Sequence, residues 1–342
     1  MSYSHRLPKV SQVAIARCLP GLGDLLCIVP ALRALRAALP EARMTLIGLP
    51  NAQSFVKRFN CYIDAWLEFP GYPGIPEGWR SPQHTQAFLT QVQAQAFDLV
   101  IQMHGSGIVS NSFVVLLGAK LNAGFFLPGY YCPDPEWFLP YPDREAEVRR
   151  HLRLMAFLDI PLQGEQLEFP LWESDWWELQ QISAVHDLQS QHYICIHPGA
   201  SISNRRWSPR QFALVADALA QQGYAIVLTG TVAETGLTEA VAEAMNTPAI
   251  NLAGRTSLGA LGALLKQAAL LVCNDTGVSH LASALQVKSV VIFSNSDPDR
   301  WRPLDRDRHR IVFASNEGAI ASVLTQAKDL LQQEVSKSKV KS

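Results

Sequence analysis

Short hydrophobic runs alternate with amphipathic stretches along almost the whole chain. The first run, Gln12–Arg17, is typical of a buried strand, and Asp24–Leu39 after it has apolar residues at helical spacing. The same alternation predicts further strands at Met44–Leu49, Ala65–Phe69 and Asp98–Met103, and helices at Gln83–Gln95 and Arg144–Leu158. Strands that alternate with helices in this way favour a parallel sheet covered by helices on both faces.

Two stretches interrupt the alternation. Leu127–Asp143 is rich in Pro, Tyr and Gly and is predicted to be irregular. Ile160–Pro170 contains two prolines and a glycine and is predicted to lie in an interdomain linker. We therefore expect an N-terminal domain over 1–160, a linker over 161–175, a second domain over 176–318, and a C-terminal helix with a frayed basic tail over 319–342.

The strand and helix pattern restarts after the predicted linker. Tyr193–His197 is a predicted strand, and Pro209–Gln222 is a predicted helix that begins with Pro and is followed by Gly223. The remaining predicted strands are Tyr224–Thr229, Ala269–Cys273 and Ser289–Phe293, and the remaining predicted helices are Val232–Met245, Ser257–Gln267, Gly277–Leu285 and Ala319–Gln333. Two open α/β domains joined by a linker would form a cleft, and such sheets bind ligands at the carboxyl ends of their strands.

Composition and charge narrow the function classes. The 342 residues are enough for about two domains, and a net charge of −1 argues against a dedicated nucleic-acid binder. The six cysteines form no CxxC pair, so we interpret them as reduced, partly buried thiols. We also find no metal-ligand spacing, no signal-peptide core and no long uncharged apolar run, so we expect a cytoplasmic protein without a bound metal or cofactor.

The strongest candidate site follows the predicted strand Ala269–Cys273. Asn274, Asp275, Thr276 and Gly277 come directly after this strand and at the start of a predicted helix, with His280 one turn later. Free backbone N–H groups and the helix dipole favour a phosphate there, and Gly277 allows close approach of a ligand. The alternative is that Asp275 or Thr276 only caps the helix, but this explains a single polar residue rather than the whole run.

A second candidate site follows the strand Tyr193–His197. His197 and Ser201 belong to a loop of small residues, and Arg205 and Arg206 follow it with fixed guanidinium groups for phosphate oxygens. The alternative is a solvated loop with Trp207 anchored in the core. Because both candidate sites follow strands of one predicted sheet, we favour phosphate binding over this alternative.

A third candidate site lies after the first strand, at Pro20–Asp24. Its glycines suggest a dinucleotide fingerprint, but position 26 is Leu and no acidic residue ends the second strand, so the pattern fails. Asp24 at a helix N-terminus would be ionised near neutral pH and suits a general base. N-capping of the helix by Asp24 is the alternative.

The segment Arg300–Arg310 contains five arginines, which Asp305 and Asp307 partly neutralise. We interpret it as a solvated face with local ion pairs. Contact with an anionic acceptor or a membrane surface is the second interpretation.

Taken together, these blocks resemble glycosyltransferase family 9, the ADP-heptose:lipopolysaccharide heptosyltransferases and their relatives. The order and spacing match over nearly the whole chain, except in the stretch 51–143. The matching blocks are Leu22–Asp24, Pro30–Arg36 with Pro40, His197–Ser201, Arg206–Pro209, Leu228–Gly230 with Glu234, Asn251–Thr256, Asn274–Ala282 and Ser296–Pro298.

The resemblance implies the GT-B fold, with two Rossmann-like, doubly wound domains facing a central cleft. It also implies an inverting, metal-independent transferase with an acceptor-side N-terminal domain and a donor-side C-terminal domain. By the same resemblance, Asp24 would be the general base and Arg205 would replace a lysine that binds phosphate. Glu234 would accept the ribose hydroxyls, residues 254–257 including Gly254 and Arg255 would meet the base, and Asp275 would meet the donor sugar. Thr276, Gly277 and His280 would meet the diphosphate, while Ser294 departs from a glycine common in the family.

The partners implied are a nucleotide-sugar donor, with an ADP-sugar favoured, and a glycan or lipid-linked glycan acceptor such as bacterial lipopolysaccharide. No nucleic-acid partner is expected, and a peripheral contact with the inner face of the membrane is left open. Two other functions stay open at this point: a non-catalytic protein that binds a nucleotide sugar or glycan, and a sugar-nucleotide epimerase.

Overall fold

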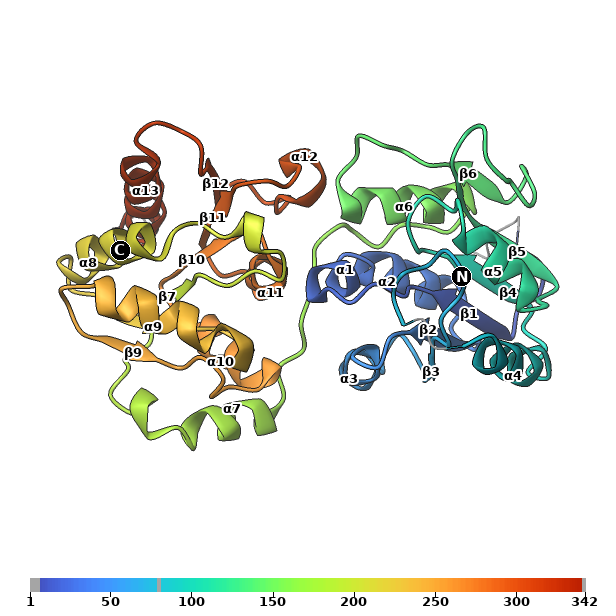
Figure 1. The fold of residues 1–342 in the computed structure, drawn as a ribbon, viewed down its shortest axis with the longest axis horizontal. Helices are drawn as coiled ribbons and strands as arrows, with labels where there is room; N and C mark the ends of the chain where they lie inside the picture. The colour runs from blue at the N-terminus through green and yellow to red at the C-terminus, as the bar shows by residue number, and fades with distance from the viewer. Residues whose placement is uncertain (1–6, 79–80, 340–342) are drawn as a thin grey trace. The chain divides into compact units, whose positions relative to one another are not determined.

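The computed structural model describes residues 7–78 and 81–339, and the chain divides into two compact units, Met1–Glu165 and Gln166–Ser342. We call them the N-terminal unit and the C-terminal unit. Each contains a six-stranded sheet with helices on its faces, and every strand pairing within the two sheets is parallel (Figure 1). The α/β class expected from the sequence is therefore confirmed.

The sheet of the N-terminal unit has the order β3-β2-β1-β4-β5-β6. Its strands are β1 (Gln12–Ala16), β2 (Arg43–Gly48), β3 (Ala65–Glu68), β4 (Leu99–Gln102), β5 (Leu121–Phe126) and β6 (Phe138–Pro140). Its helices are α1 (Leu22–Leu26), α2 (Val29–Ala38), α3 (Ala52–Arg58), α4 (Pro82–Gln93), α5 (Ser110–Leu116) and α6 (Glu147–Phe157).

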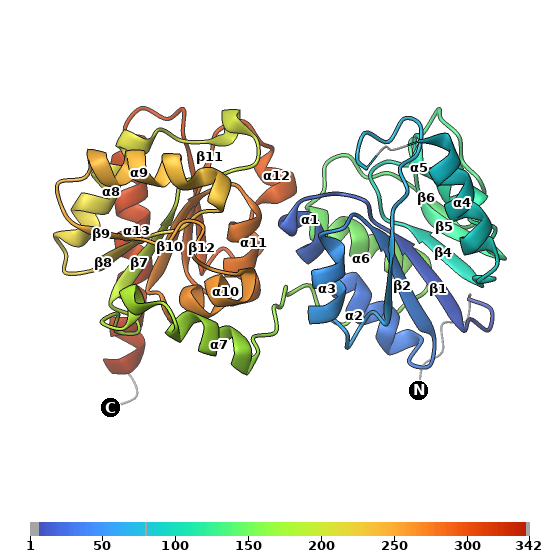
Figure 2. The same cartoon turned by 60° about the horizontal axis from the view of Figure 1, so that its bottom comes forward.

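The core of the N-terminal unit lies on both faces of β1 and β4. On one face, Ala14 and Ala16 of β1 pack in a cluster with Phe88 of α4 and Phe113 of α5. Helices α2 and α6 pack against each other on the other face (Figure 2). Small alanines in the central strand leave room for the aromatic rings, which fixes how α4 and α5 sit on the sheet.

The sheet of the C-terminal unit has the order β12-β11-β10-β7-β8-β9. Its strands are β7 (Tyr193–His197), β8 (Ala225–Leu228), β9 (Ala249–Asn251), β10 (Leu270–Asn274), β11 (Ser289–Phe293) and β12 (His309–Phe313). Its α-helices are α7 (Glu173–Gln180), α8 (Pro209–Ala220), α9 (Thr235–Ala244), α10 (Leu258–Gln267), α11 (Gly277–Ala284), α12 (Pro298–Trp301) and α13 (Ala319–Lys339), with 3₁₀ turns at η1 (Ser183–Val185), η2 (Ser203–Arg205) and η3 (Val232–Glu234).

The core of the C-terminal unit is formed largely by α8 and α13 against the sheet. Ile194 and Ile196 of β7 pack with Phe212 of α8 and with Val323 and Leu330 of α13. Helix α13 therefore belongs to the core of this unit rather than to a separate tail (Figure 1). Its helical backbone continues to Lys339, into the stretch predicted to be frayed, and residues 340–342 lie outside the described residues.

Several predicted boundaries were wrong. The predicted helix Asp24–Leu39 is two helices, α1 and α2, with the break at Cys27 and Ile28 ahead of Pro30. The stretch Leu127–Asp143 is not wholly irregular, because β6 lies within it and pairs with β5. Helix α7 begins at Glu173 and packs on α10, and the linker predicted over 161–175 stays a prediction.

Both sheets have the strand order of a doubly wound fold, and this positions the candidate sites. The order reverses between β1 and β4 in the N-terminal unit and between β7 and β10 in the C-terminal unit. Loops that leave such a pair of strands diverge to opposite faces, which opens a crevice at their carboxyl ends where ligands bind.

Candidate functional site

The two loops predicted to bind phosphate leave adjacent strands of the C-terminal unit. Cys273 of β10 is in register with His197 of β7, so Asn274 and Pro198 begin the two loops side by side. The fully buried Asn274 joins them, because its Nδ2 donates to the Pro198 carbonyl at 2.7 Å and its Oδ1 accepts from the Trp207 N–H at 2.9 Å. Asn274 is therefore a structural cross-link, whereas the sequence had suggested a ligand-facing run that includes it.

Asp275 and Arg205 form the charged pair of this site. Asp275 is buried, and one of its carboxylate oxygens lies 4.0 Å from Nη1 of Arg205. Burial raises the pKa of Asp275 above its ordinary value, while the charge of Arg205 opposes this rise. Arg205 ends η2 and is only partly buried, so its guanidinium also has surface left for a ligand.

Helix α11 begins directly beside this pair. Thr276 is its N-cap with an extended backbone at φ −156°, and its side chain makes no capping hydrogen bond to the helix. The first-turn N–H groups of α11, at Gly277 and Val278, lie at the positive end of the helix dipole, where an anion is stabilised. His280, one turn further on, is buried with its ring edge-on to Trp301 at 6.1 Å between centroids.

His197 and Glu234 form a second polar pair near the end of β7. Burial lowers the pKa of His197 to about 4, so its ring is neutral near pH 7, and its Nδ1 lies 3.0 Å from the Thr229 hydroxyl. Although burial opposes ionisation of Glu234, hydrogen bonds from the Thr231 N–H and hydroxyl lower its pKa. A side chain at Gly199 would collide with the Glu234 carboxylate and displace it from Thr231, so glycine here leaves room for Glu234.

The other predicted donor-site residues lie in neighbouring loops. Arg206 is exposed, its Nε donates to the Ala200 carbonyl at 2.8 Å, and its charge helps to lower the pKa of Glu234. Gly254 has φ +70°, and a side chain there would press on the backbone of Val232. Ser201 and Arg255 are exposed, Ser201 in the loop after β7 and Arg255 in the turn after β9.

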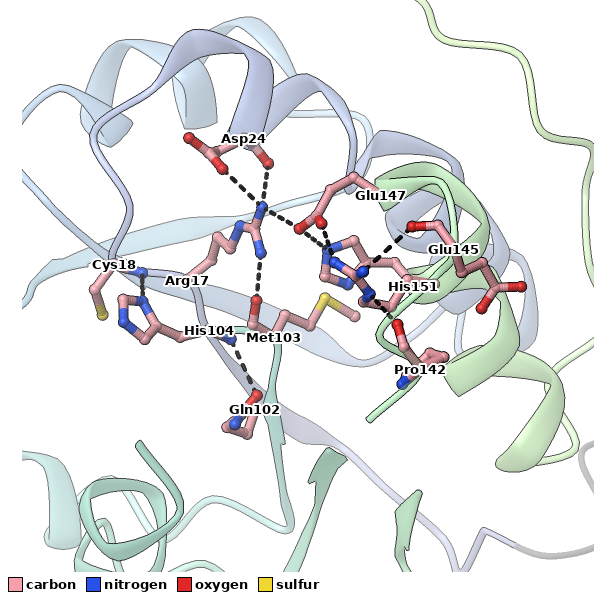
Figure 3. Close-up of polar contacts among 11 residues, drawn as sticks. Arg17, Cys18, Asp24, Gln102, Met103, His104, Pro142, Glu145, Glu147 and His151 are labelled. Carbon is pink, nitrogen blue, oxygen red and sulfur yellow. Dashed lines mark hydrogen bonds and ion pairs between the residues drawn. The ribbon is translucent and has the colours of Figure 1, made fainter. Parts of the chain in front are cut away.

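The N-terminal unit carries Asp24 at the corresponding edge of its own sheet. Asp24 lies in the first turn of α1, whose N-cap is Gly21, so Asp24 itself is not the N-cap residue. Nη2 of Arg17, at the end of β1, donates to Asp24 Oδ1 at 3.3 Å and to the Asp24 carbonyl at 3.1 Å (Figure 3). The carboxylate keeps about a fifth of its side-chain surface exposed, so a substrate hydroxyl can reach it.

Three residues around Asp24 were not predicted from the sequence: Arg17, His104 and Glu147. Arg17 is buried and bonded to Glu147, a residue 130 positions later in the chain. His104 follows β4, its Nδ1 accepts from the Cys18 N–H at 3.3 Å, and burial lowers its pKa to about 4. Arg17 could have been found from the sequence, because it is a charged residue at the end of an apolar strand. A charged side chain that is fully buried there needs a partner.

Several arginines of the basic segment Arg300–Arg310 make local contacts within the described part of the chain. Arg308 pairs with Asp305 at 2.6 Å, Arg302 with Asp299 at 3.6 Å, and the Arg300 guanidinium lies 4.7 Å from the centre of the Trp301 ring. This arrangement fits the interpretation of a solvated face with ion pairs. Contact of the segment with an acceptor or membrane stays a prediction.

Residues 7–78 and 81–339 contain neither a metal-binding cluster nor a membrane-spanning helix. No group of three or more His, Cys, Asp or Glu side chains in these ranges is arranged to hold a metal ion. None of the helices in the same ranges combines the length and apolar character needed to cross a bilayer.

Comparisons with known proteins agree on one family. The model of glycosyltransferase family 9 (heptosyltransferase) matches residues 85–329. The chain is similar to lipopolysaccharide heptosyltransferase 3 of Escherichia coli K12, with 34% identity over 115 residues, and this match spans only about a third of either protein: 33% of this chain and 33% of the relative.

Two solved structures share the fold over nearly their whole length. A family 9 glycosyltransferase from Veillonella parvula superposes with a TM-score of 0.77 at 20% identity, covering 94% of this chain and 98% of that one. The ADP-heptose lipopolysaccharide heptosyltransferase II of E. coli gives 0.72 at 20% identity, with 95% and 99% covered. The expected GT-B fold, with two Rossmann-like units, is therefore confirmed.

Proposed function

The chain belongs to glycosyltransferase family 9, and from this premise we propose that it transfers a sugar, heptose or a similar one, from a nucleoside-diphosphate donor to a glycan acceptor. The observation that carries the proposal is the pair of polar sites at the two strand-order reversals. One offers a guanidinium beside a helix start, and the other offers a partly exposed carboxylate. A diphosphate leaving group and a proton acceptor are the two groups that such a transfer requires.

The donor is proposed to bind the C-terminal unit. Arg205 and the start of α11 suit the diphosphate, because both present positive charge or N–H groups at one edge of the sheet. The ionised Glu234 suits the ribose hydroxyls, and the turn at Gly254 and Arg255 suits the base. The E. coli relative with ADP-heptose in its name makes an ADP-sugar the first donor to test.

The acceptor is proposed to bind the N-terminal unit, with Asp24 as general base. Asp24 takes the proton of an acceptor hydroxyl while that oxygen forms a bond to the anomeric carbon of the donor sugar. The bond between this carbon and the diphosphate oxygen breaks, and the nucleoside diphosphate leaves from the opposite face, so the configuration inverts. Arg205 and the α11 N–H groups stabilise the negative charge that develops on the leaving group.

A metal ion is not required in this scheme, because protein groups meet the diphosphate charge. We therefore propose that turnover continues in a chelator. Rate measurements with excess EDTA, before and after addition of magnesium or manganese, check this. Loss of turnover in EDTA that either metal restores would contradict the scheme.

The lipopolysaccharide heptosyltransferases among the relatives make a lipopolysaccharide-type acceptor the first choice, and such an acceptor would place the protein at the inner face of the membrane. Purified protein should be screened against a panel of nucleotide sugars by thermal shift, followed by product detection with each stabilising donor. Stabilisation with transfer supports the proposal. Binding without turnover would favour a non-catalytic binding protein, and conversion of the donor sugar without an acceptor would favour an epimerase.

A further inference from the structure

A buried chain of alternating charges connects Asp24 to helix α6 (Figure 3). Nη2 of Arg17 donates both to Asp24 Oδ1 at 3.3 Å and to Glu147 Oε1 at 3.0 Å. The other carboxylate oxygen of Glu147 accepts from Nη1 of Arg150. The side chains of Arg17, Glu147 and Arg150 are only 1–2% exposed, so solvent does little to screen this chain of charges.

Arg17 is held in one orientation by several elements. Its Nη1 donates to the Met103 carbonyl after β4 at 2.6 Å, and its Nη2 also donates to the Asp24 carbonyl at 3.1 Å. Its Nε is buried without a hydrogen-bond partner among the described residues. The contacts of Nη1 and Nη2 therefore fix the orientation of the guanidinium at the expense of Nε. Glu147 is the charged partner that shares Nη2 with Asp24.

The other titratable groups around Asp24 carry little charge near neutral pH. Burial lowers the pKa of His104 and of His151 to about 4, with the charge of Arg17 acting in the same direction on both. Burial likewise raises the pKa of the Cys18 thiol, and Glu77 near it adds to that rise. Arg17 contacts Asp24 directly, Glu147 and Arg150 continue the chain of charges, and Glu77 acts on Cys18.

Arg17 alone would make Asp24 a poor base. A guanidinium beside a carboxylate stabilises the ionised form and lowers the carboxylate pKa, which weakens its pull on a substrate proton. Glu147 places a compensating negative charge on the same nitrogen of Arg17. Because Arg17 and Glu147 are both buried, solvent screens the effect of the Glu147 charge on Asp24 only weakly.

We propose that Glu147 is a positioning residue for the transfer reaction, which keeps the Asp24 carboxylate oriented and basic by binding and balancing Arg17. This inference rests on the proposed function, in which Asp24 takes the acceptor proton. Glu147 does not itself need to touch either substrate. Its effect passes through Arg17, so it should appear in the titration of Asp24 as well as in the rate.

The test is the substitution Glu147→Gln, read by the carboxyl titration of Asp24. Protein labelled with carboxyl-¹³C aspartate is titrated by NMR, and the Asp24 signal is identified by its absence in Asp24→Asn. Removing the negative charge should lower the pKa of Asp24 by about one unit. The acid limb of the pH profile of kcat/KM should move to lower pH by the same amount, and the plateau rate should fall roughly three- to tenfold.

Two variants control the test. Glu145→Gln lies two positions earlier and removes an acid that pairs with the exposed Arg153, so neither the Asp24 pKa nor the acid limb should move. Glu147→Asp keeps the charge and should hold the Asp24 pKa close to that of the wild type. If Glu147→Gln does not fold, the double variant Glu147→Gln/Arg150→Gln removes the buried pair together and should shift the pKa in the same direction by less.

An unchanged Asp24 pKa in folded Glu147→Gln, or in Glu147→Gln/Arg150→Gln if the single variant does not fold, would overturn the inference, as would an equal shift in Glu145→Gln. This outcome is separable from failure of the proposed function. If no donor is transferred, the NMR titration still reports whether Glu147 acts on Asp24. If transfer occurs and the titration does not move, the function stands and the role of Glu147 does not.

Discussion

At the scale of single residues, Arg205 should dominate donor binding. Its guanidinium lies beside Asp275 and the start of α11, whereas the Nε of Arg206 is engaged by the Ala200 carbonyl. Hydrogen bonds to charged groups contribute about 1.5–3 kcal/mol, so Arg205→Ala should weaken ADP binding roughly 10- to 150-fold in calorimetry. Arg206→Ala is the matched control and should weaken ADP binding less than Arg205→Ala does. If Arg206→Ala loses more ADP affinity than Arg205→Ala, then Arg206 rather than Arg205 makes the phosphate contact.

The sequence could predict residues whose chemistry is local and could not predict those whose partners are distant. Asp275, Thr276 and Gly277 were identifiable because a strand, a polar run and a helix start follow one another in the chain. The structural role of Asn274 was not identifiable, since its two partners lie 67 and 76 residues away. The same holds for Arg17 and Glu147, which only the packing of α6 beside β1 and α1 brings together.

At the scale of elements, the junction between the loops after β7 and β10 should depend on Asn274. Asn274→Ala leaves the Trp207 N–H and the Pro198 carbonyl buried without their partner, at a cost of about 1–3 kcal/mol each. We expect a clear fall in melting temperature and weaker donor binding together. Asn274→Asp would bury a carboxylate against the Pro198 carbonyl and beside Asp275, so it should destabilise the unit at least as much as Asn274→Ala. Wild-type melting and affinity in Asn274→Ala would contradict this role.

The central strands β1, β2, β4, β7, β8, β10 and β11 and the edge strand β3 were predicted, whereas β5 and the edge strands β6, β9 and β12 were not. β1, β4, β7 and β10 are buried apolar runs, so their pattern is strong. The edge strands β6, β9 and β12 are short or only partly buried and lack that pattern. Helix α7 was missed because its three large apolar residues do not line one face and because it follows a stretch with two prolines.

At the scale of the whole molecule, stability should fall as the solution becomes acidic. Burial lowers the pKa of His104, His151, His197 and His309 to about 4, against about 6.5 in an unfolded chain. Between these values the unfolded state binds more protons, so the free energy of unfolding decreases as pH falls from about 7 to about 4. Each histidine contributes on the order of 3 kcal/mol once the change is complete.

Urea midpoints at pH 7 and pH 5 check this dependence. The midpoint should be lower at pH 5, and the non-titrating substitution His309→Gln should make the difference smaller because one of the four histidines is removed. A midpoint that is independent of pH in this range, or higher at pH 5, would show that these histidines are not held neutral in the folded chain.

The central claim joins the two units in one reaction: Asp24 of the N-terminal unit is the base, and the C-terminal unit binds the donor. The most direct measurement is turnover and donor affinity of Asp24→Asn on one preparation, with melting temperature as the control for folding. The account predicts a 10²- to 10⁴-fold loss of turnover, the typical contribution of a general base, with donor affinity and melting temperature nearly unchanged. Wild-type turnover in a folded Asp24→Asn protein would contradict it.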